Sequence, residues 1–270
     1  MNLVSFELFN TSGEPIRGDM RFQSGRVARP AVVICHSFMA FKNWGWFPYV
    51  AERLAQAGFV SVSFNFSRSG VNEPPDRITD FDAFASNTIS HELEDLEVVL
   101  KAIVRGEIGK YLIDPGRIAL LGHSRGAAIA LLAAAGSENV SVLVSWSSVA
   151  TFDRWTEHQK TQWRKAGFLP LSKDSAISPL LNDIEGNRGT LDLVGAAARV
   201  RVPWLIVHGS EDLIVRFSEA EQLFAASDQS KTTLIPLKKV GHLYGGPEVT
   251  PDSAIHRVLD ETIQWLKRAM

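Results

Sequence analysis

The sequence predicts an α/β fold: a mostly parallel central sheet with helices on both faces and an antiparallel hairpin at its N-terminal edge. Short apolar runs rich in β-branched residues alternate with segments of helical periodicity, which is the pattern of a parallel sheet buried on both faces. The chain has 270 residues, 45% of them hydrophobic and 21% charged. This is the composition of a globular protein, and we expect residues 1–270 to form a single domain.

The first two expected strands form the hairpin. Residues 3–9 and 18–24 alternate between apolar and polar side chains, and residues 11–15 between them contain the Ser, Gly and Pro typical of a turn. The later strands are apolar runs, which indicates burial on both faces. We expect them at residues 31–36, 60–66, 118–121, 140–146, 204–208 and 232–237.

Helical segments separate these strands. An apolar face over residues 47–54 precedes Gly58, which favours a helix end there. Apolar residues recur every three or four positions over residues 89–103, and residues 127–135 are almost entirely Ala, Leu and Ile. The last helix is expected to begin with Thr250 as N-cap and Pro251 at its first position. Its apolar face comprises Ile255, Val258, Leu259, Ile263 and Leu266.

Residues 151–200 interrupt this alternation. They contain no convincing strand, only a helix-like stretch at 153–166 followed by a passage rich in Pro, Gly, Asn and Asp. We interpret the segment as a small cap or lid inserted between two strands, because such insertions often carry function on a rigid scaffold. An ordinary crossover helix with a long connection is the alternative.

The central motif is Gly122-His123-Ser124-Arg125-Gly126, between an expected buried strand and an expected buried helix. Gly-x-Ser-x-Gly in this context indicates a sharp strand-to-helix turn that holds the serine in strained backbone geometry. Glycines are required where neighbouring backbone comes close. Ser124 is therefore the candidate nucleophile, at the carboxyl edge of the sheet.

A serine nucleophile needs a base and a group that fixes the base's tautomer. Asp212 follows the strand at 204–208, and His242 follows the strand at 232–237. Their loops are expected at the same sheet edge as Ser124, and the order serine, acid, histidine is that of α/β hydrolases. Glu211 is the competing acid.

The oxyanion formed during attack needs two hydrogen-bond donors. The backbone amide of Arg125 is one candidate. The loop after the strand at 31–36 is expected to supply the other, with Phe38 preferred and Ser37 second.

The chain resembles the α/β-hydrolase superfamily over nearly its whole length. His36-Ser37-Phe38, residues 64–70, the serine motif and residues 208–212 are similar to the branch of dienelactone-hydrolase-like proteins and cinnamoyl or feruloyl esterases. The resemblance implies the α/β-hydrolase fold and hydrolysis through an acyl-enzyme without a cofactor, by Ser124, Asp212 and His242. Ser37 departs from the usual glycine, and Arg125 from a neutral residue. Dienelactone hydrolases carry cysteine at the Ser124 position, which disfavours their substrate.

Aromatic residues surround the expected site. Those after the oxyanion loop and near the insertion either line an apolar acyl pocket or fill the core. The substrate-binding candidates are Ser37, Phe41, Trp44, Trp146 and Trp155. A separate hypothesis is that Lys42, Arg68 or Arg125 binds a carboxylate of the substrate.

Charge and cysteine content exclude other classes of function. A net charge of -2 and a pI of about 6.4 argue against nucleic-acid binding. Cys35 is the single cysteine, so an intramolecular disulfide and an all-cysteine metal site are excluded. The sequence contains neither a secretory-signal pattern nor an apolar run long enough to span a membrane, and the expected location is cytoplasmic. No metal, cofactor or membrane partner is expected, and the oligomeric state stays open.

The sequence thus predicts a serine carboxylesterase acting on a small ester with a small or aromatic acyl group. A serine peptidase of the acyl-peptide-hydrolase type and a thioesterase remain as alternatives. So does a binding module that keeps the triad without turnover, because fold does not fix function.

Overall fold

The computed structural model describes residues 1–25, 27–72, 77–171 and 176–270. Within these residues eight strands form one twisted sheet, in which β1, β2 and β4 are joined by antiparallel pairings and all other neighbours are parallel. The predicted mostly parallel sheet with an N-terminal hairpin is therefore confirmed. In spatial order the strands are β1 (Asn2–Phe9), β2 (Pro15–Phe22), β4 (Val60–Phe64), β3 (Arg29–Cys35), β5 (Ile113–His123), β6 (Val142–Trp146), β9 (Trp204–Gly209) and β10 (Thr232–Leu237).

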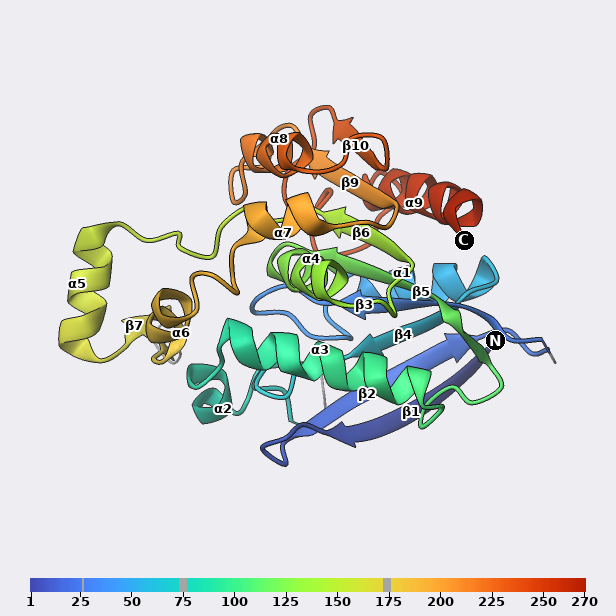
Figure 1. Ribbon diagram of the computed structural model, residues 1–270, viewed down its shortest axis with the longest axis horizontal. Coiled ribbons are helices and arrows are strands. Elements are labelled where there is room, and N and C mark those ends of the chain that lie inside the picture. Colours follow the sequence, from blue (N-terminus) through green and yellow to red (C-terminus); the bar gives the residue numbers. More distant parts are fainter. Residues whose placement is uncertain (26, 73–76, 172–175) are drawn as a thin grey trace.

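Helices cover both faces of the sheet, as Figure 1 shows. Alternate side chains of the buried strands point to opposite faces, so Val32 and Ile34 join one apolar cluster while Val33 and Cys35 join the other. The first cluster packs under α1 (Phe47–Gln56) and α9 (Ile255–Ala269). The second packs under α3 (Ile89–Val104), α4 (Arg125–Gly136), α7 (Leu193–Arg199) and α8 (Phe217–Ala226).

The hairpin turn is shorter than predicted. Strand β2 begins at Pro15, which pairs with Phe9, and not at residue 18, and it ends at Phe22 and not at residue 24. A proline is tolerated at the first position of a strand because its missing N–H is not needed there. The turn is instead closed by the Asn10 side chain, whose Oδ1 accepts hydrogen bonds from the amides of Ser12 and Glu14.

The start of the last helix was also predicted wrongly. Helix α9 begins at Ile255, and Thr250 is not its N-cap. Thr250 and Ser253 close a separate turn, since the Ser253 amide donates to the Thr250 carbonyl and the Thr250 amide donates to Ser253 Oγ. The local Thr-Pro pattern is the same at a turn and at a helix start, which is why the sequence misled. The predicted apolar face of α9 is buried.

The segment between β6 and β9 contains α5 (Glu157–Ala166), the two-residue strands β7 (Leu169–Pro170) and β8 (Ala176–Ile177), α6 (Leu180–Gly186) and α7. Residues 172–175 of the predicted insertion lie outside the described residues. Helix α5 begins at Glu157, after a capping box between Thr156 and Gln159, and ends at Gly167 in the left-handed region. Figure 1 shows α5 and α6 projecting away from the sheet, while α7 lies beside α4.

No helix in the described ranges has both the length and the apolar character required to span a bilayer. The described residues also contain no group of three or more His, Cys, Asp or Glu side chains arranged to hold a metal ion.

Candidate active site

Ser124 lies at the turn between β5 and α4 with φ 55° and ψ -122°. Positive φ is costly for a residue with a side chain, so the surrounding contacts must hold this conformation. The Ser124 amide donates to the Trp146 carbonyl of the neighbouring strand. A Cβ at Gly126 would lie 2.3 Å from the carbonyl oxygens of Cys35 and His36. Glycine at position 126 therefore lets the end of β3 approach the serine turn.

Asp212 and His242 come from the loops that follow β9 and β10, which are neighbouring parallel strands. Asp212 Oδ2 lies 2.7 Å from His242 Nδ1. The loops are joined directly, since the Glu211 amide donates to the Val240 carbonyl at 3.0 Å. Glu211, the competing acid, is exposed. The structure thus brings Asp212 and not Glu211 to the histidine.

His123 connects this pair to the serine turn. Its ring Nε2 lies 3.0 Å from the His242 carbonyl, and the two imidazole centroids are 4.7 Å apart. His242 is therefore held beside the residue that precedes Ser124. Within the described part of the chain no hydrogen bond joins Ser124 Oγ to His242. Such bonds are often long without substrate and tighten when it binds.

The surroundings of Asp212 stabilise its ionised form. Burial alone would raise the pKa of its carboxyl, but hydrogen bonds from His208, His242 and the Val215 amide outweigh burial and hold the pKa well below its usual range. Oδ1 accepts from the amides of Ile214 and Val215 at 2.9 and 2.8 Å. An ionised Asp212 orients His242 with Nδ1–H toward the carboxylate, which leaves Nε2 as the basic atom.

The two predicted oxyanion donors come from the loop after β3 and from the first residue of α4. Phe38 follows β3, and in the described structure its amide has no protein acceptor. Arg125 is the first residue of α4, where amides lack partners within the helix and the helix dipole favours negative charge. Burial lowers the pKa of His36 to about 4, so the ring beneath this loop is neutral. His36 bridges the Ser37 carbonyl and the Phe66 amide at 2.9 and 3.2 Å, which fixes the loop.

A cavity of about 170 Å³ opens beside the serine. Ser124, Arg125 and Phe38 form one part of its wall, and the segment after β6 forms another. The lining is mostly apolar, as is usual for small-molecule sites. The remaining lining residues are Ile89, Val149, Phe152, Arg154, Trp155, Leu180, Ile184, Ile214 and Val215.

Of the predicted substrate-binding residues, Trp155 lines the cavity and the others do not. Trp146 is fully buried on the opposite face of β6, where its Nε1 donates to Thr262 Oγ1 of α9. Trp44 packs against the same apolar cluster. Phe41 and Ser37 are buried, and the Ser37 carbonyl is occupied by His36 and the Ala40 amide. The structure therefore places Trp155 in the cavity wall and the other four side chains outside it, and a substrate contact for those four stays a prediction.

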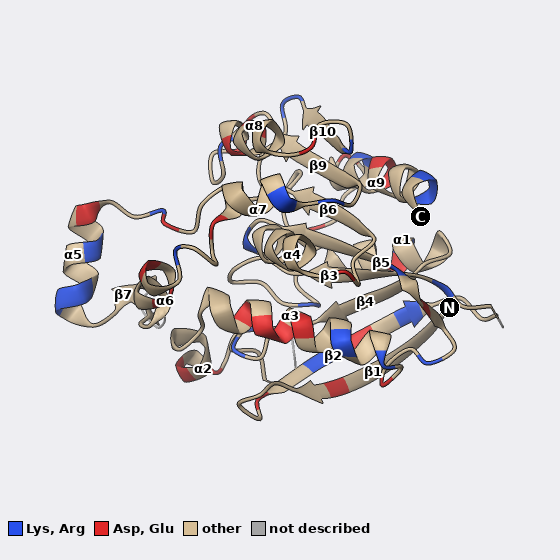
Figure 2. Cartoon of the chain, viewed as in Figure 1, with Lys and Arg blue, Asp and Glu red and all other residues tan. Residues whose placement is uncertain are grey.

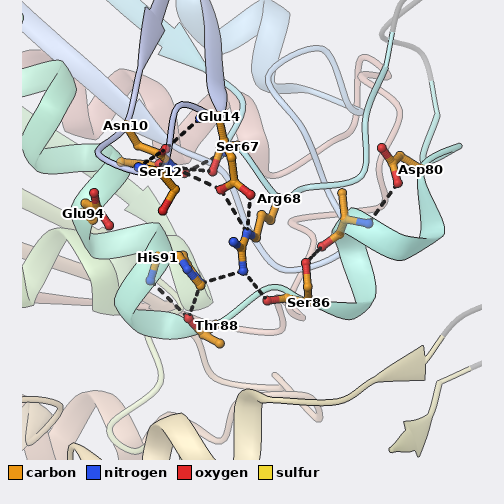
Figure 3. A network of polar contacts seen from close by, with 12 residues as sticks. Asn10, Ser12, Glu14, Ser67, Arg68, Asp80, Ser86, Thr88, His91 and Glu94 are labelled. Carbon is orange, nitrogen blue, oxygen red and sulfur yellow. Dashed lines mark hydrogen bonds and ion pairs between the residues drawn. The ribbon is translucent and has the colours of Figure 1, made fainter.

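Two of the three cations considered for a substrate carboxylate are committed elsewhere. Lys42 is buried in an ion pair with Asp19 of β2. Arg68 Nε lies 2.9 Å from both Glu14 carboxylate oxygens, and its Nη1 donates to the Ser86 carbonyl and lies 3.3 Å from His91 Nδ1, as Figure 3 shows. Arg125 alone of the three lines the cavity.

Sequence reasoning missed the group beneath Arg125. Glu92 of α3 is buried and forms an ion pair with Arg125, at 3.3 Å between Oε1 and Nη1. Asn87 Nδ2 donates to the same oxygen at 2.7 Å. Glu92 falls on the buried side of a helix whose other buried residues are apolar except for Asp95. A glutamate at that position was the available signal, but its partner lies 33 positions away in the sequence.

The fold, the strained serine turn and the acid–histidine pair define the class of α/β-hydrolase-fold proteins. The sequence profile of the Alpha/beta hydrolase family matches residues 32–254. The chain belongs to this family, as its sequence resemblance predicted.

A curated relative and several solved structures are similar to this chain. An Escherichia coli protein described as an uncharacterized 31.7 kDa protein in the traX-finO intergenic region is 26% identical over 157 residues, which cover 58% of this chain and 50% of that protein. The match thus spans half the length of this curated relative. The alpha/beta hydrolase GrgF from Penicillium sp. superposes with a TM-score of 0.76 at 16% identity, covering 100% of this chain and 99% of the other.

Two further structures carry names relevant to function. Est1E from Butyrivibrio proteoclasticus, solved with ferulic acid bound, has a TM-score of 0.76 at 15% identity and 98% coverage of both chains. The acylaminoacyl peptidase of Pyrococcus horikoshii has a TM-score of 0.73 at 16% identity, covering 100% of this chain and 42% of the peptidase. At these identities the likeness establishes the shared fold.

Proposed function

We propose that the protein is a serine hydrolase that cleaves carboxylic esters through an acyl-enzyme. One observation carries the proposal. Ser124, at a strained turn, borders an apolar cavity, and His242, held by an ionised Asp212 2.7 Å away, lies beside that turn. This combination of nucleophile, oriented base and acid is the general requirement of serine hydrolysis. Membership of the Alpha/beta hydrolase family supports it.

The reaction follows from the roles of these groups. His242 Nε2 accepts the Ser124 proton as Oγ attacks the ester carbonyl carbon. The amides of Phe38 and Arg125 stabilise the resulting oxyanion, and loss of one such donor typically costs on the order of 10²- to 10³-fold in rate. The imidazolium then protonates the leaving alcohol. Water repeats the sequence on the acyl-enzyme and releases the carboxylic acid.

The substrate class follows from the cavity. A volume of about 170 Å³ accommodates a small acyl group, either aliphatic or a single aromatic ring. Phe152, Trp155, Leu180 and Ile184 of the segment between β6 and β9 line it, so we propose that residues 151–200 shape acyl specificity. The structural likeness to Est1E with bound ferulic acid supports an aromatic acyl group among the substrates.

A substrate panel tests the proposal. Short-chain and hydroxycinnamoyl methyl esters, the matching acyl-CoA thioesters and acylated dipeptides are assayed with wild type and Ser124→Ala. Faster hydrolysis of esters than of thioesters and amides, lost in Ser124→Ala, supports the esterase. Preference for amides supports the peptidase that the Pyrococcus match suggests, and preference for acyl-CoA supports a thioesterase. No turnover of any member, with ligand binding retained, supports a binding module.

A further inference from the structure

The side chain of Arg125 occupies an unusual position for a charged group. It is 11% exposed, lines the cavity next to Ser124, and lies with its Cζ 3.7 Å from the centroid of the Phe38 ring. Phe38 in turn stacks on Phe84, with centroids 5.5 Å apart and planes at 21°. The guanidinium is therefore held in a fixed orientation by an aromatic face and by Glu92.

The hydrogen-bonding capacity of this guanidinium is mostly unused. An arginine carries five N–H donors, and within the described residues the Arg125 side chain makes one hydrogen bond, from Nη1 to Glu92 Oε1 at 3.3 Å. That distance is long for a charge-assisted bond, which is usually 2.7–2.9 Å. The other arginine of the cavity differs, because Arg154 binds both Glu219 oxygens and the Ile214 carbonyl. Arg125 therefore has donors available for a ligand in the cavity.

The charges around Arg125 select the kind of acceptor. Glu92 is 4% exposed and already compensates the guanidinium, and Asp95 and Asp183 lie close enough to Glu92 to interact electrostatically with it. Figure 2 shows acidic residues gathered along α3. Arg125 is the one cation among Arg125, Glu92, Asp95 and Asp183. A substrate carboxylate beside Arg125 would add a further negative charge to these four residues. A neutral oxygen acceptor gains the hydrogen bonds without that cost.

We propose that Arg125 selects esters whose acyl group carries a neutral oxygen acceptor, such as a ketone, beyond the scissile carbonyl. Its guanidinium donates to that oxygen while Ser124 attacks. This specificity rests on the proposed esterase function and adds a substrate class to it. It also replaces the expectation that a basic residue meets a substrate carboxylate.

An isosteric series of methyl esters tests the proposal. Methyl 4-oxopentanoate, methyl 4-methylpentanoate and monomethyl succinate share one branched heavy-atom skeleton and end in a ketone, an isopropyl group and a carboxylate, and a second series is one carbon longer. The observable is the ratio of kcat/KM between members within each variant. We expect wild type to favour the oxo ester over the methyl-branched ester by roughly tenfold to a hundredfold in at least one series, as for hydrogen bonds to charged groups.

Variants separate the side chain from the backbone amide at the same position. Arg125→Met keeps the amide and the apolar stem but leaves Glu92 buried and unpaired, so the double variant Arg125→Met with Glu92→Gln removes both charges. Both should lose the oxo preference. The matched control Arg68→Met, at an arginine that is paired with Glu14 outside the cavity, should keep it.

Binding of the same esters to Ser124→Ala, measured by calorimetry, provides a readout without turnover. If wild type hydrolyses no ester, the proposed function fails, while the order of binding still decides the role of Arg125. Equal kcat/KM or affinity for oxo and methyl-branched esters in both series would overturn the inference. So would an oxo preference that survives in the double variant, or a preference for the carboxylate ester over the oxo ester.

Discussion

Asp212 and His242, 30 positions apart in the sequence, are joined by a 2.7 Å contact between Oδ2 and Nδ1 across the ends of two neighbouring parallel strands. The remaining carboxylate oxygen is saturated by the amides of Ile214 and Val215. The other oxygen, Oδ2, faces His242 and also lies 3.4 Å from His208 Nε2. The orientation of the His242 ring depends on its contact with Oδ2.

Asp212→Asn tests the acid. With its oxygen in the Oδ1 position the side-chain amide keeps both backbone contacts but presents an N–H donor to His242 Nδ1, which favours the wrong imidazole tautomer. We expect kcat to fall by about 10⁴-fold, the loss typical of this substitution in serine hydrolases, with the fold retained. Steady-state kinetics measures kcat, and circular dichroism shows whether the fold is retained. The exposed neighbour Glu211→Gln should be unaffected, and a comparable loss in that variant would assign the acid to Glu211.

Gly126→Ala tests the close approach of β3 to the serine turn. The new Cβ would meet the Cys35 and His36 carbonyl oxygens at 2.3 Å, and backbone atoms cannot give way easily. We expect a loss of about 3 kcal/mol or more in the free energy of unfolding, measured by urea denaturation. Gly136→Ala, at the other end of the same helix, has open space around its Cβ and should change the free energy by less than about 1 kcal/mol. Similar values for both variants would contradict the packing argument.

Trp146→Phe tests whether Trp146 stabilises the core or contacts the substrate. The tryptophan is fully buried and donates to Thr262 Oγ1 at 3.1 Å. Loss of ring volume and of this hydrogen bond should cost about 1–3 kcal/mol of unfolding free energy. Relative kcat/KM values for different acyl groups should stay constant at a temperature where both proteins are folded. A changed acyl preference would return Trp146 to the substrate site.

Buried neutral histidine makes stability depend on pH. Burial lowers the pKa of His36 from 6.5 to about 4. Between those values the unfolded chain binds a proton that the folded protein does not, so stability falls as pH drops from about 6.5 to about 4. The shift corresponds to roughly 3 kcal/mol. Urea denaturation at several pH values gives the free energy of unfolding as a function of pH. The slope of this free energy against pH should be shallower in His36→Gln than in wild type.

The exposed His158→Gln is the matched control for this measurement. Its unfolding free energy should follow the wild-type pH dependence. Equal slopes for wild type and His36→Gln between pH 6.5 and 4 would show that His36 is not held neutral by burial.

Much of the fold was predictable because its signals are local. The alternation of apolar runs and helical periodicity gave the sheet, and the strand at residues 232–237 matches β10 at both ends. Element boundaries were less predictable where one pattern serves two structures. Pro15 reads as a turn residue but opens β2, and Thr250 with Pro251 reads as a helix start but forms a turn. Tertiary contacts decided both cases.

For the site, the sequence order of Ser124, Asp212 and His242 was informative because parallel strands end at one sheet edge. The residues of the cavity wall could not be predicted from the sequence in the same way. Both faces of β6 are buried, so its apolar run did not indicate which face lies near the cavity. Trp146 and Val144 belong to the apolar cluster on the other face. The Arg125–Glu92 pair joins two helices distant in sequence, and a charged residue in an apolar helical face gives no indication of its partner.

The most direct test of the account is labelling with a fluorophosphonate probe, which reacts with an activated serine. Intact-mass measurement and peptide mapping are applied to wild type, Ser124→Ala and His242→Ala. We predict one adduct on wild type, mapped to Ser124, none on Ser124→Ala and strongly slowed labelling of His242→Ala. Absence of labelling in folded wild type, or an adduct on another serine, would contradict the assignment of Ser124 as an activated nucleophile.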